Sequence, residues 1–146
     1  MRSDPMRSPR FHPDGTLPQH PDTILVFGSN QRGRHGKGAA LIAAQRFGAI
    51  EGVSTGLMGQ SYGIPTKDVR IKTLLLQDIV PGVIEFCKFV AEHPDRRFYV
   101  TRVACGLAGH QDGIVATIFK NAFDATHYVP ANCSFAEEWR PWLAFE

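Results

Sequence analysis

Ile24-Leu25-Val26-Phe27 is a continuous apolar run that ends at Gly28, and this stretch decides the fold we expect. Successive side chains of a strand point to opposite faces, so four adjacent apolar residues need cover on both faces. A glycine-rich turn follows, and Ala40, Ala43, Ala44 and Phe47 then recur at helical spacing before Gly48. The order predicts a buried strand joined directly to a helix, a unit typical of α/β proteins.

Strands and helices are expected to alternate through the rest of the chain. The pattern predicts strands at 61–65, 98–103 and 126–129, and helices that begin near Asp78 and at Asp112. A capping box at 134–137 predicts a short last helix that runs to about Pro141. This alternation predicts an α/β fold with three α/β/α layers and a mixed, mostly parallel sheet. Ligands of such folds bind at the carboxyl ends of the strands.

Half of the ten prolines lie within residues 1–21, among Arg, Ser, Asp and His. Proline lacks the N–H donor that a helix or a central strand needs, so we expect 1–21 to be an extended or disordered arm. The remaining residues, 22–146, are enough for one domain with its own core.

Composition narrows the setting and the function class. A net charge of +2 is far below the dense positive charge that sequence-independent binding to a nucleic-acid backbone usually needs. The widely spaced Cys87, Cys105 and Cys133 suggest neither a disulfide framework nor a zinc cluster. No apolar run approaches the length of a membrane helix. We therefore expect a cytoplasmic protein with no membrane partner, no metal and no resident cofactor.

The turn from Gly28 to Ala40 is the strongest candidate binding site. Its glycines permit close approach of the backbone to a ligand, and the start of the following helix offers free N–H groups that favour an anion. Arg32 and Arg34 add positive charge, although the spacing of a Walker A loop is absent. The alternative is an ordinary connection with solvated basic side chains. Candidate ligand-binding residues here are Gly28, Ser29, Asn30, Gly33, His35, Gly36, Lys37, Gly38 and Ala39.

Three segments, in order, resemble the macro-domain family, whose members recognise ADP-ribose. They are Asn30 with the turn that opens a helix at 36–40, the segment 64–67, and the segment 102–107. The last two are similar to the subgroup that removes ADP-ribose from acidic side chains and to small macro-like proteins of bacteria and phages. The resemblance implies that Asn30 contacts the distal ribose and that a loop of Cys105, Gly106, Leu107, Ala108 and Gly109 binds phosphate.

Two departures from the family pattern make binding better supported than catalysis. Ala108 stands where the hydrolytic subgroup carries a catalytic aspartate. The chain before Ile24 shows no evident pair of strands with the aspartate that commonly binds adenine. We therefore predict binding of ADP-ribose or a related nucleotide, and leave hydrolysis of ADP-ribosyl linkages open.

Lys67, which the resemblance matches to a reactive lysine, is the first catalytic candidate, acting as a nucleophile if burial lowers its pKa. The alternative is a solvated pair with Asp68. His110 and Asp112 follow the second loop and are candidates to position water as a general base would, and the alternative for Asp112 is that it only caps its helix. Cys105 is either a nucleophile or a small buried residue.

Two further alternatives concern mobility and partners. The glycine-rich segment 55–62 is either a flap over the ligand or a surface loop. A competing function is a non-catalytic accessory protein of phage or bacterial origin that contacts protein or nucleic acid. Its nucleic-acid contacts would be Arg2, Arg7, Arg10, Arg32, Arg34 and Lys37. An ADP-ribosylated protein or nucleic acid is the partner that the binding hypothesis implies.

Overall fold

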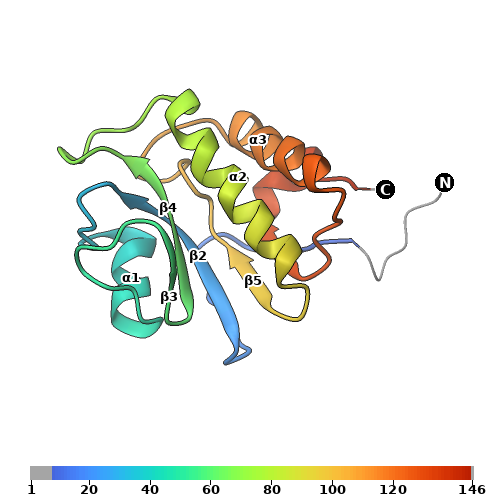
Figure 1. Cartoon of the computed structure of the whole chain (residues 1–146), viewed down its shortest axis with the longest axis horizontal. Helices are drawn as coiled ribbons and strands as arrows, with labels where there is room; N and C mark the ends of the chain where they lie inside the picture. Colours follow the sequence, from blue (N-terminus) through green and yellow to red (C-terminus); the bar gives the residue numbers. More distant parts are fainter. Residues whose placement is uncertain (1–7, 146) are drawn as a thin grey trace.

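The apolar run of the sequence forms the central strand of a sheet in a computed structural model that describes residues 8–145 (Figure 1). The strands are β1 (Arg10–His12), β2 (Thr23–Asn30), β3 (Gly56–Met58), β4 (Ser61–Lys67), β5 (Arg97–Val100) and β6 (Cys133–Ala136). The helices are α1 (Gly38–Arg46), α2 (Leu76–Glu92), α3 (Asp112–Thr126) and the 3₁₀ helix η2 (Glu137–Trp142). No helix of residues 8–145 is long and apolar enough to cross a membrane.

The six strands lie in the order β1-β6-β5-β2-β4-β3. All neighbouring strands pair in parallel except β3 and β4, which are antiparallel. A parallel pair needs a crossover, and α1, α2 and α3 supply the helices of those crossovers. The prediction of a mixed, mostly parallel sheet is confirmed.

Alternate residues of β2 enter two different cores, as the period of a strand requires. Ile24 and Val26 pack in the larger core with α2 and α3, which lie side by side over the sheet (Figure 1). Leu25 and Phe27 pack on the opposite face against α1. The predicted three-layer α/β/α arrangement is therefore confirmed.

The strand predicted at 126–129 is wrong. Thr126 is the last residue of α3, and His127 ends the helix with a left-handed backbone (φ 59°). The strand of this region is β6, which contains Ser134 of the predicted capping box. Ser134 does not cap a helix; its Oγ is 2.7 Å from Nδ1 of His12. Backbone pairing with β1 and β5 replaces the local hydrogen bonds that a capping box supplies.

Residues 8–21 of the predicted arm, which we call the leader, contain the extended strand β1 followed by turns at 14–15 and 21–22, and β1 belongs to the sheet. Arg10 and Phe11 of β1 pair in parallel with Ser134 and Phe135 of β6. The domain therefore begins before residue 22, because β1 covers an edge of β6 that would otherwise be unpaired. Residues 1–7 of the predicted arm, with Arg2 and Arg7, lie outside the described residues.

The connections of β2 and β5 run in opposite directions. Strand β2 leads through α1 toward β4, whereas β5 leads through α3 to β6 on the other side. Because β2 and β5 are neighbours, their loops separate at the carboxyl ends of the strands. Such a switch point leaves a crevice where α/β proteins bind ligands.

Candidate functional site

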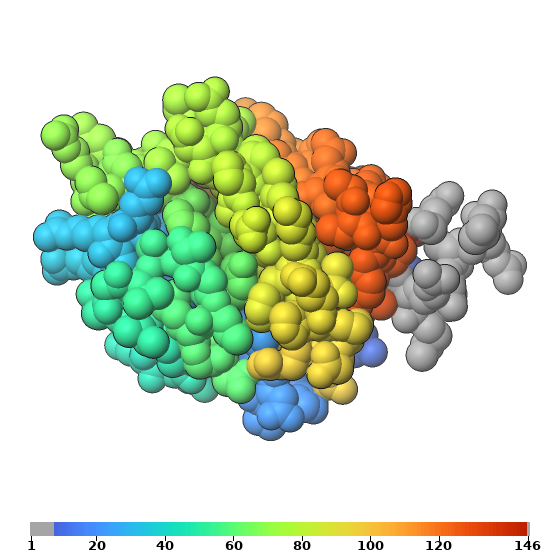
Figure 2. Space-filling model, viewed as in Figure 1, coloured from blue at the N-terminus to red at the C-terminus, as the bar shows by residue number. Residues whose placement is uncertain are grey.

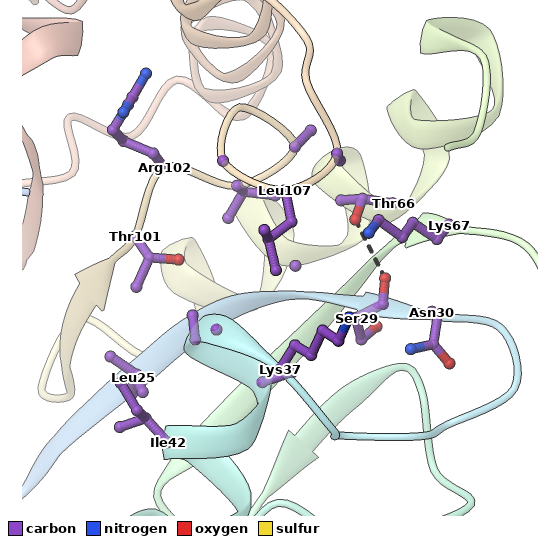
Figure 3. A pocket seen from close by; sticks show the side chains of 18 of the residues that line it. Leu25, Ser29, Asn30, Lys37, Ile42, Thr66, Lys67, Thr101, Arg102 and Leu107 are labelled. Atoms are coloured by element: carbon purple, nitrogen blue, oxygen red, sulfur yellow. Dashed lines mark hydrogen bonds between the residues drawn. The ribbon is translucent and has the colours of Figure 1, made fainter. Parts of the chain in front are cut away.

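A pocket of about 680 Å³ occupies this crevice at the carboxyl ends of β2, β4 and β5 (Figure 3). Its volume is within the range of small-molecule sites, about 300–1,000 Å³. The two predicted loops meet there, together with the candidate lysine. The predicted residues that line the pocket are Gly28, Ser29, Asn30, Gly36, Lys37, Gly38, Ala39, Lys67, Gly106, Leu107 and Ala108.

The start of α1 forms one wall. Lys37 precedes the helix with an extended backbone, and no side chain caps the first turn. The first N–H groups of a helix have no partner within it, so those of Gly38, Ala39 and Ala40 are available to a ligand. All three residues line the pocket. This wall combines unpaired donors with the positive end of the helix dipole, which suits a phosphate.

The loop after β5 forms the facing wall. Ala104 has a left-handed backbone (φ 67°), and its carbonyl accepts a hydrogen bond from the N–H of His110, which closes the loop. Leu107 at its tip reaches across to α1, so that a Cβ on Gly38 would lie 3.2 Å from Leu107 Cδ1. The two loops are therefore in contact at this point, and glycine at 38 allows Leu107 to approach the start of α1.

The floor is built from backbone at the ends of β2 and β4. A Cβ on Gly28 would lie 3.1 Å from Oγ1 of Thr66, which itself donates a hydrogen bond to the carbonyl of Ser29 (Figure 3). A larger residue at 28 would displace Thr66 and narrow the crevice. Gly28 thus permits the close approach of β2 to Thr66 of β4, and the approach of a ligand to Gly28 stays a prediction.

Asn30 lines the pocket, but its amide also holds the turn. Its Nδ2 donates to the carbonyl of Arg34 at 2.7 Å, and its Oδ1 accepts from the N–H of Arg34 at 3.0 Å. The hydroxyl of Ser29 likewise donates to the carbonyl of Ser54. These hydrogen bonds fix the course of the loop that leads to α1.

Lys67, the last residue of β4, is half-buried and lines the pocket. Its ammonium group points toward Thr66 (Figure 3). Asp68 forms no ion pair with it; the Asp68 carboxylate accepts hydrogen bonds from the N–H groups of Arg70 and Lys72. The backbone hydrogen bond from Lys72 is the main cause that lowers the pKa of Asp68. The geometry favours the pocket over the alternative of a surface pair.

Gly33 and His35, predicted to bind ligand, lie outside the pocket lining and shape the turn from behind. Gly33 has φ of 73°, and a Cβ there would lie 2.4 Å from the carbonyl carbon of Gly52. His35 is 3% exposed; its N–H donates to Glu51 Oε1, and its Nε2 is 2.9 Å from the carbonyl of Ile50. Both residues dock the turn onto the segment 50–52.

Asp112, a predicted catalytic residue, also lies outside the lining and neither faces the pocket nor caps α3. Its carboxylate accepts from Arg102 Nε at 2.9 Å, from Arg102 Nη2 at 2.6 Å and from Trp139 Nε1 at 2.8 Å. The hydrogen bond with Arg102 is the main cause that lowers the pKa of Asp112. The carboxylate therefore anchors the β5 loop, α3 and η2 to one another.

Three other candidates of the second loop are outside the pocket lining. The Nε2 of His110 is 2.9 Å from the carbonyl of Leu74, which ties the loop to the approach to α2. Burial is the main cause that raises the pKa of Cys105 to about 12, so its thiol stays protonated and the nucleophile alternative loses support. Gly109 has a left-handed backbone (φ 83°), a conformation that glycine adopts without strain, at the end of the loop.

A third wall of the pocket, which the sequence patterns did not predict, comes from residues 12–17 of the leader. His12 stacks on Tyr99 with ring centres 3.7 Å apart, and the hydroxyl of Thr16 hydrogen-bonds that of Tyr99. Asp14 pairs with Arg102 at 3.2 Å. All five residues line the pocket. The turn signal Pro13-Asp14-Gly15 indicated a bend, but no local feature indicated what the bend would contact.

The residues that line the pocket differ in polarity between its two ends. Leu17, Leu25 and Ile42 with Tyr99 make one end largely apolar, whereas Asn30 and Lys67 lie at the other (Figure 3). The segment 55–62, considered as a flap, forms β3 and the start of β4 instead. None of its residues lines the pocket, and Met58, Ser61 and Tyr62 are buried, so the segment is neither a flap over the pocket nor a surface loop.

Comparisons with protein-family models, with curated proteins and with solved structures found no match to this chain. The fold and the site define an α/β/α domain with a ligand-sized pocket at its switch point.

Proposed function

We propose that this chain binds ADP-ribose, or a closely related nucleotide with a pyrophosphate, in the pocket at the switch point. The carrying observation is that two glycine-containing loops face each other in the pocket. One is 36–40, whose first helical N–H groups at the start of α1 are unpaired, and the other is 104–108. A pyrophosphate would bind at these N–H groups, with the exposed side chain of Leu107 moving aside and Lys37 as a counter-charge. The resemblance to macro domains supports the same ligand.

The two ends of the pocket suit the two ends of such a ligand. The apolar end, with Leu25, Ile42 and Tyr99, offers surfaces for a flat base, and the Asp14 carboxylate beside it accepts hydrogen from an amino group. Asp14 lies before Ile24, in the part of the chain where the sequence showed no evident pair of strands with an adenine-binding aspartate. The polar end, with Asn30 and Lys67, offers donors for ribose hydroxyls.

Isothermal titration with ADP-ribose tests the proposal, with AMP and inorganic pyrophosphate as partial ligands. Gly106→Val is the matched variant, because Gly106 lines the pocket and a Cβ there meets no atom within 4 Å, so we expect the larger side chain to narrow the pocket while the fold is kept. We expect wild type to bind ADP-ribose more tightly than either fragment, and Gly106→Val to lose binding with an unchanged melting temperature. The absence of binding to wild type would overturn the proposal.

Hydrolysis of an ADP-ribosyl linkage is the enzymatic form of this function, and the position of Lys67 in the pocket favours it. The neutral lysine amine would attack the anomeric carbon of the distal ribose, and the bond from this carbon to the acceptor carboxylate would break, so that the carboxylate leaves. Water would then add to the same carbon, which releases ADP-ribose and returns the lysine as a free amine. Lys67→Ala should abolish release of ADP-ribose from a modified acceptor while affinity changes little, and Lys67→Arg should not restore turnover. If wild type releases nothing, the chain is a binding protein without this activity.

A further inference from the structure

Six cationic residues surround the polar end of the pocket on two adjoining loops. We call this set the basic rim: Arg32, Arg34, Lys37, Lys67, Arg70 and Lys72. The N–H of Gln31 donates to the carbonyl of Lys67 at 2.8 Å, so the loop after β2 and the end of β4 are joined. The loops 31–37 and 68–73 project next to each other from the molecule (light blue and light green in Figure 2).

The basic rim carries more positive charge than the carboxylates near it offset, although the Asp68 carboxylate attracts Arg70 and Lys72. Five of its side chains belong to exposed residues, and none of the six takes part in an ion pair among residues 8–145. Two carboxylates lie near. Asp68 is bound to rim backbone N–H groups, and Glu51, beside Arg32 and Arg34, is bound to the N–H of His35. The small net charge of the chain therefore conceals a concentrated positive surface at one end of the pocket.

The basic rim extends beyond what a free nucleotide needs. Arg70 and Lys72 do not line the pocket, although the intervening Ile71 does. Val69 and Ile71 are 58% and 40% exposed, and Ile71 has a left-handed backbone (φ 63°), which is costly for a β-branched residue. Cations that continue from the pocket onto the adjoining surface suit a ligand whose phosphates continue beyond the pocket.

We propose that the group attached to the distal ribose is a single-stranded nucleic acid whose first phosphates cross the basic rim. The ligand is then a nucleic-acid strand whose end is joined to a nucleoside by a pyrophosphate. The inference rests on the proposed function, because it needs the pyrophosphate in the pocket and the distal ribose near Lys67. A nucleic acid is favoured over an acidic peptide because its phosphate chain continues the chemistry of the pocket onto the rim.

Fluorescence polarisation with a labelled strand of ten thymidines tests this. One strand carries a 5′-adenylyl group through a pyrophosphate, a second carries ADP-ribose on its terminal phosphate, and a third carries only a 5′-phosphate. We expect one or both of the first two to bind at least about tenfold more tightly than free ADP-ribose at low salt. A single-strand phosphate contact contributes about 0.7 to the slope of log affinity against log salt, so six contacts give about −4.

The double variant Arg70→Ser/Lys72→Ser separates the rim from the pocket. It should bind ADP-ribose like wild type, lose about tenfold in affinity for the capped strand, and show a salt slope smaller by about 1.4. The matched control is Lys88→Ser/Arg97→Ser, on α2 and at the amino end of β5, which should bind the capped strand like wild type.

The outcomes separate this inference from the proposed function. If ADP-ribose binds but neither capped strand binds more tightly, or the double variant does not weaken it, the nucleic-acid inference is wrong and the pocket proposal stands. The inference is also wrong if the strand with only a 5′-phosphate binds as tightly as the capped strands, in wild type and in Gly106→Val alike. It is wrong as well if decaglutamate, an acidic peptide, displaces the capped strand as effectively as the uncapped strand does. If wild type binds neither ADP-ribose nor a capped strand, both fail.

Discussion

At the scale of residues, the glycines of the turn after β2 divide into two kinds that the sequence does not distinguish. Gly28, Gly36 and Gly38 line the pocket, whereas Gly33 has its Cα against the backbone of Gly52. All were candidates for ligand binding, because a glycine in sequence does not reveal whether a ligand or another backbone needs the space. Asn30 and His35 show the same ambiguity for polar residues.

Gly33→Ala should destabilise the fold by at least about 2 kcal/mol, because it combines a left-handed backbone with an overlap against backbone atoms that cannot yield cheaply. Urea unfolding measures this. Gly36→Ala is the control, since a Cβ there meets only Arg34 Nε, at 3.8 Å, and it should change the unfolding free energy by less than about 1 kcal/mol. Equal effects of the two variants would contradict the assignment.

His12 makes the stability of the fold sensitive to pH. Burial is the main cause that lowers its pKa from 6.5 to about 4. The unfolded chain therefore binds a proton between these values and the folded chain does not, so stability is full above pH 6.5 and is lost as pH falls toward 4. The loss is at most about 3 kcal/mol, since one pKa unit corresponds to about 1.4 kcal/mol.

Urea unfolding between pH 7 and 4 checks this expectation. His12→Phe keeps an aromatic ring against Tyr99 but cannot titrate, so its stability should fall less over the same interval. A parallel decline in both proteins would show that other groups cause the pH dependence.

At the scale of elements, the loop after β5 is held in place by a carboxylate that sequence reasoning placed in catalysis. Asp112 starts α3, Arg102 follows β5, and Trp139 lies fully buried in η2. The pairing of these three elements positions residues 104–108 against the start of α1. It follows that the position of this wall depends on the contact of Arg102, which lines the pocket, with Asp112 outside the lining.

Asp112→Asn should destabilise the fold by about 1–3 kcal/mol, because it weakens a charge-assisted, partly buried network and leaves Arg102 partly unpaired. Asp124→Asn is the matched control on the same helix. Its carboxylate is 50% exposed and pairs with Lys120, so its loss should cost less than about 1 kcal/mol. Chemical denaturation measures both, and a smaller effect at 112 than at 124 would contradict the anchoring role.

At the scale of the whole molecule, the two helical layers are unequal. The core between the sheet and α2 and α3 includes Phe86, Phe119, Phe135 and Trp139, whereas the α1 side has six buried apolar residues. Local opening is easier where less apolar surface is buried. The pocket therefore lies against the weaker layer of the fold.

Hydrogen exchange should show faster exchange in α1 than in α2 and α3 without ligand. ADP-ribose should slow exchange in α1 and in 104–108 more than elsewhere, because binding stabilises the conformation that binds. Gly106→Val supplies the control, since exchange in that variant should not respond to ADP-ribose. Equal protection of the three helices without ligand would contradict the expected inequality.

The sequence alone was sufficient for features that local patterns specify. The apolar run before Gly28, the helical spacing of Ala40 and Ala43, and the alternation that follows predicted the confirmed α/β/α fold. Lys67 and residues 106–108 were selected as candidates, and they lie together because the carboxyl ends of parallel strands share one edge of a sheet. Periodicity reports which faces of an element are buried, and that was enough for these predictions.

Only the tertiary structure determined the features that depend on pairing between segments far apart in the chain. Ser134 has the local signature of a helix cap, yet it pairs with Arg10, more than a hundred residues away, as part of a strand. The same pairing brings His12, Asp14 and Thr16 to the pocket, and Arg102 draws Asp112 away from it. A local pattern measures a segment against its neighbours in the chain, whereas backbone and carboxylate groups take partners that folding brings from elsewhere, and those partners set the walls of the site.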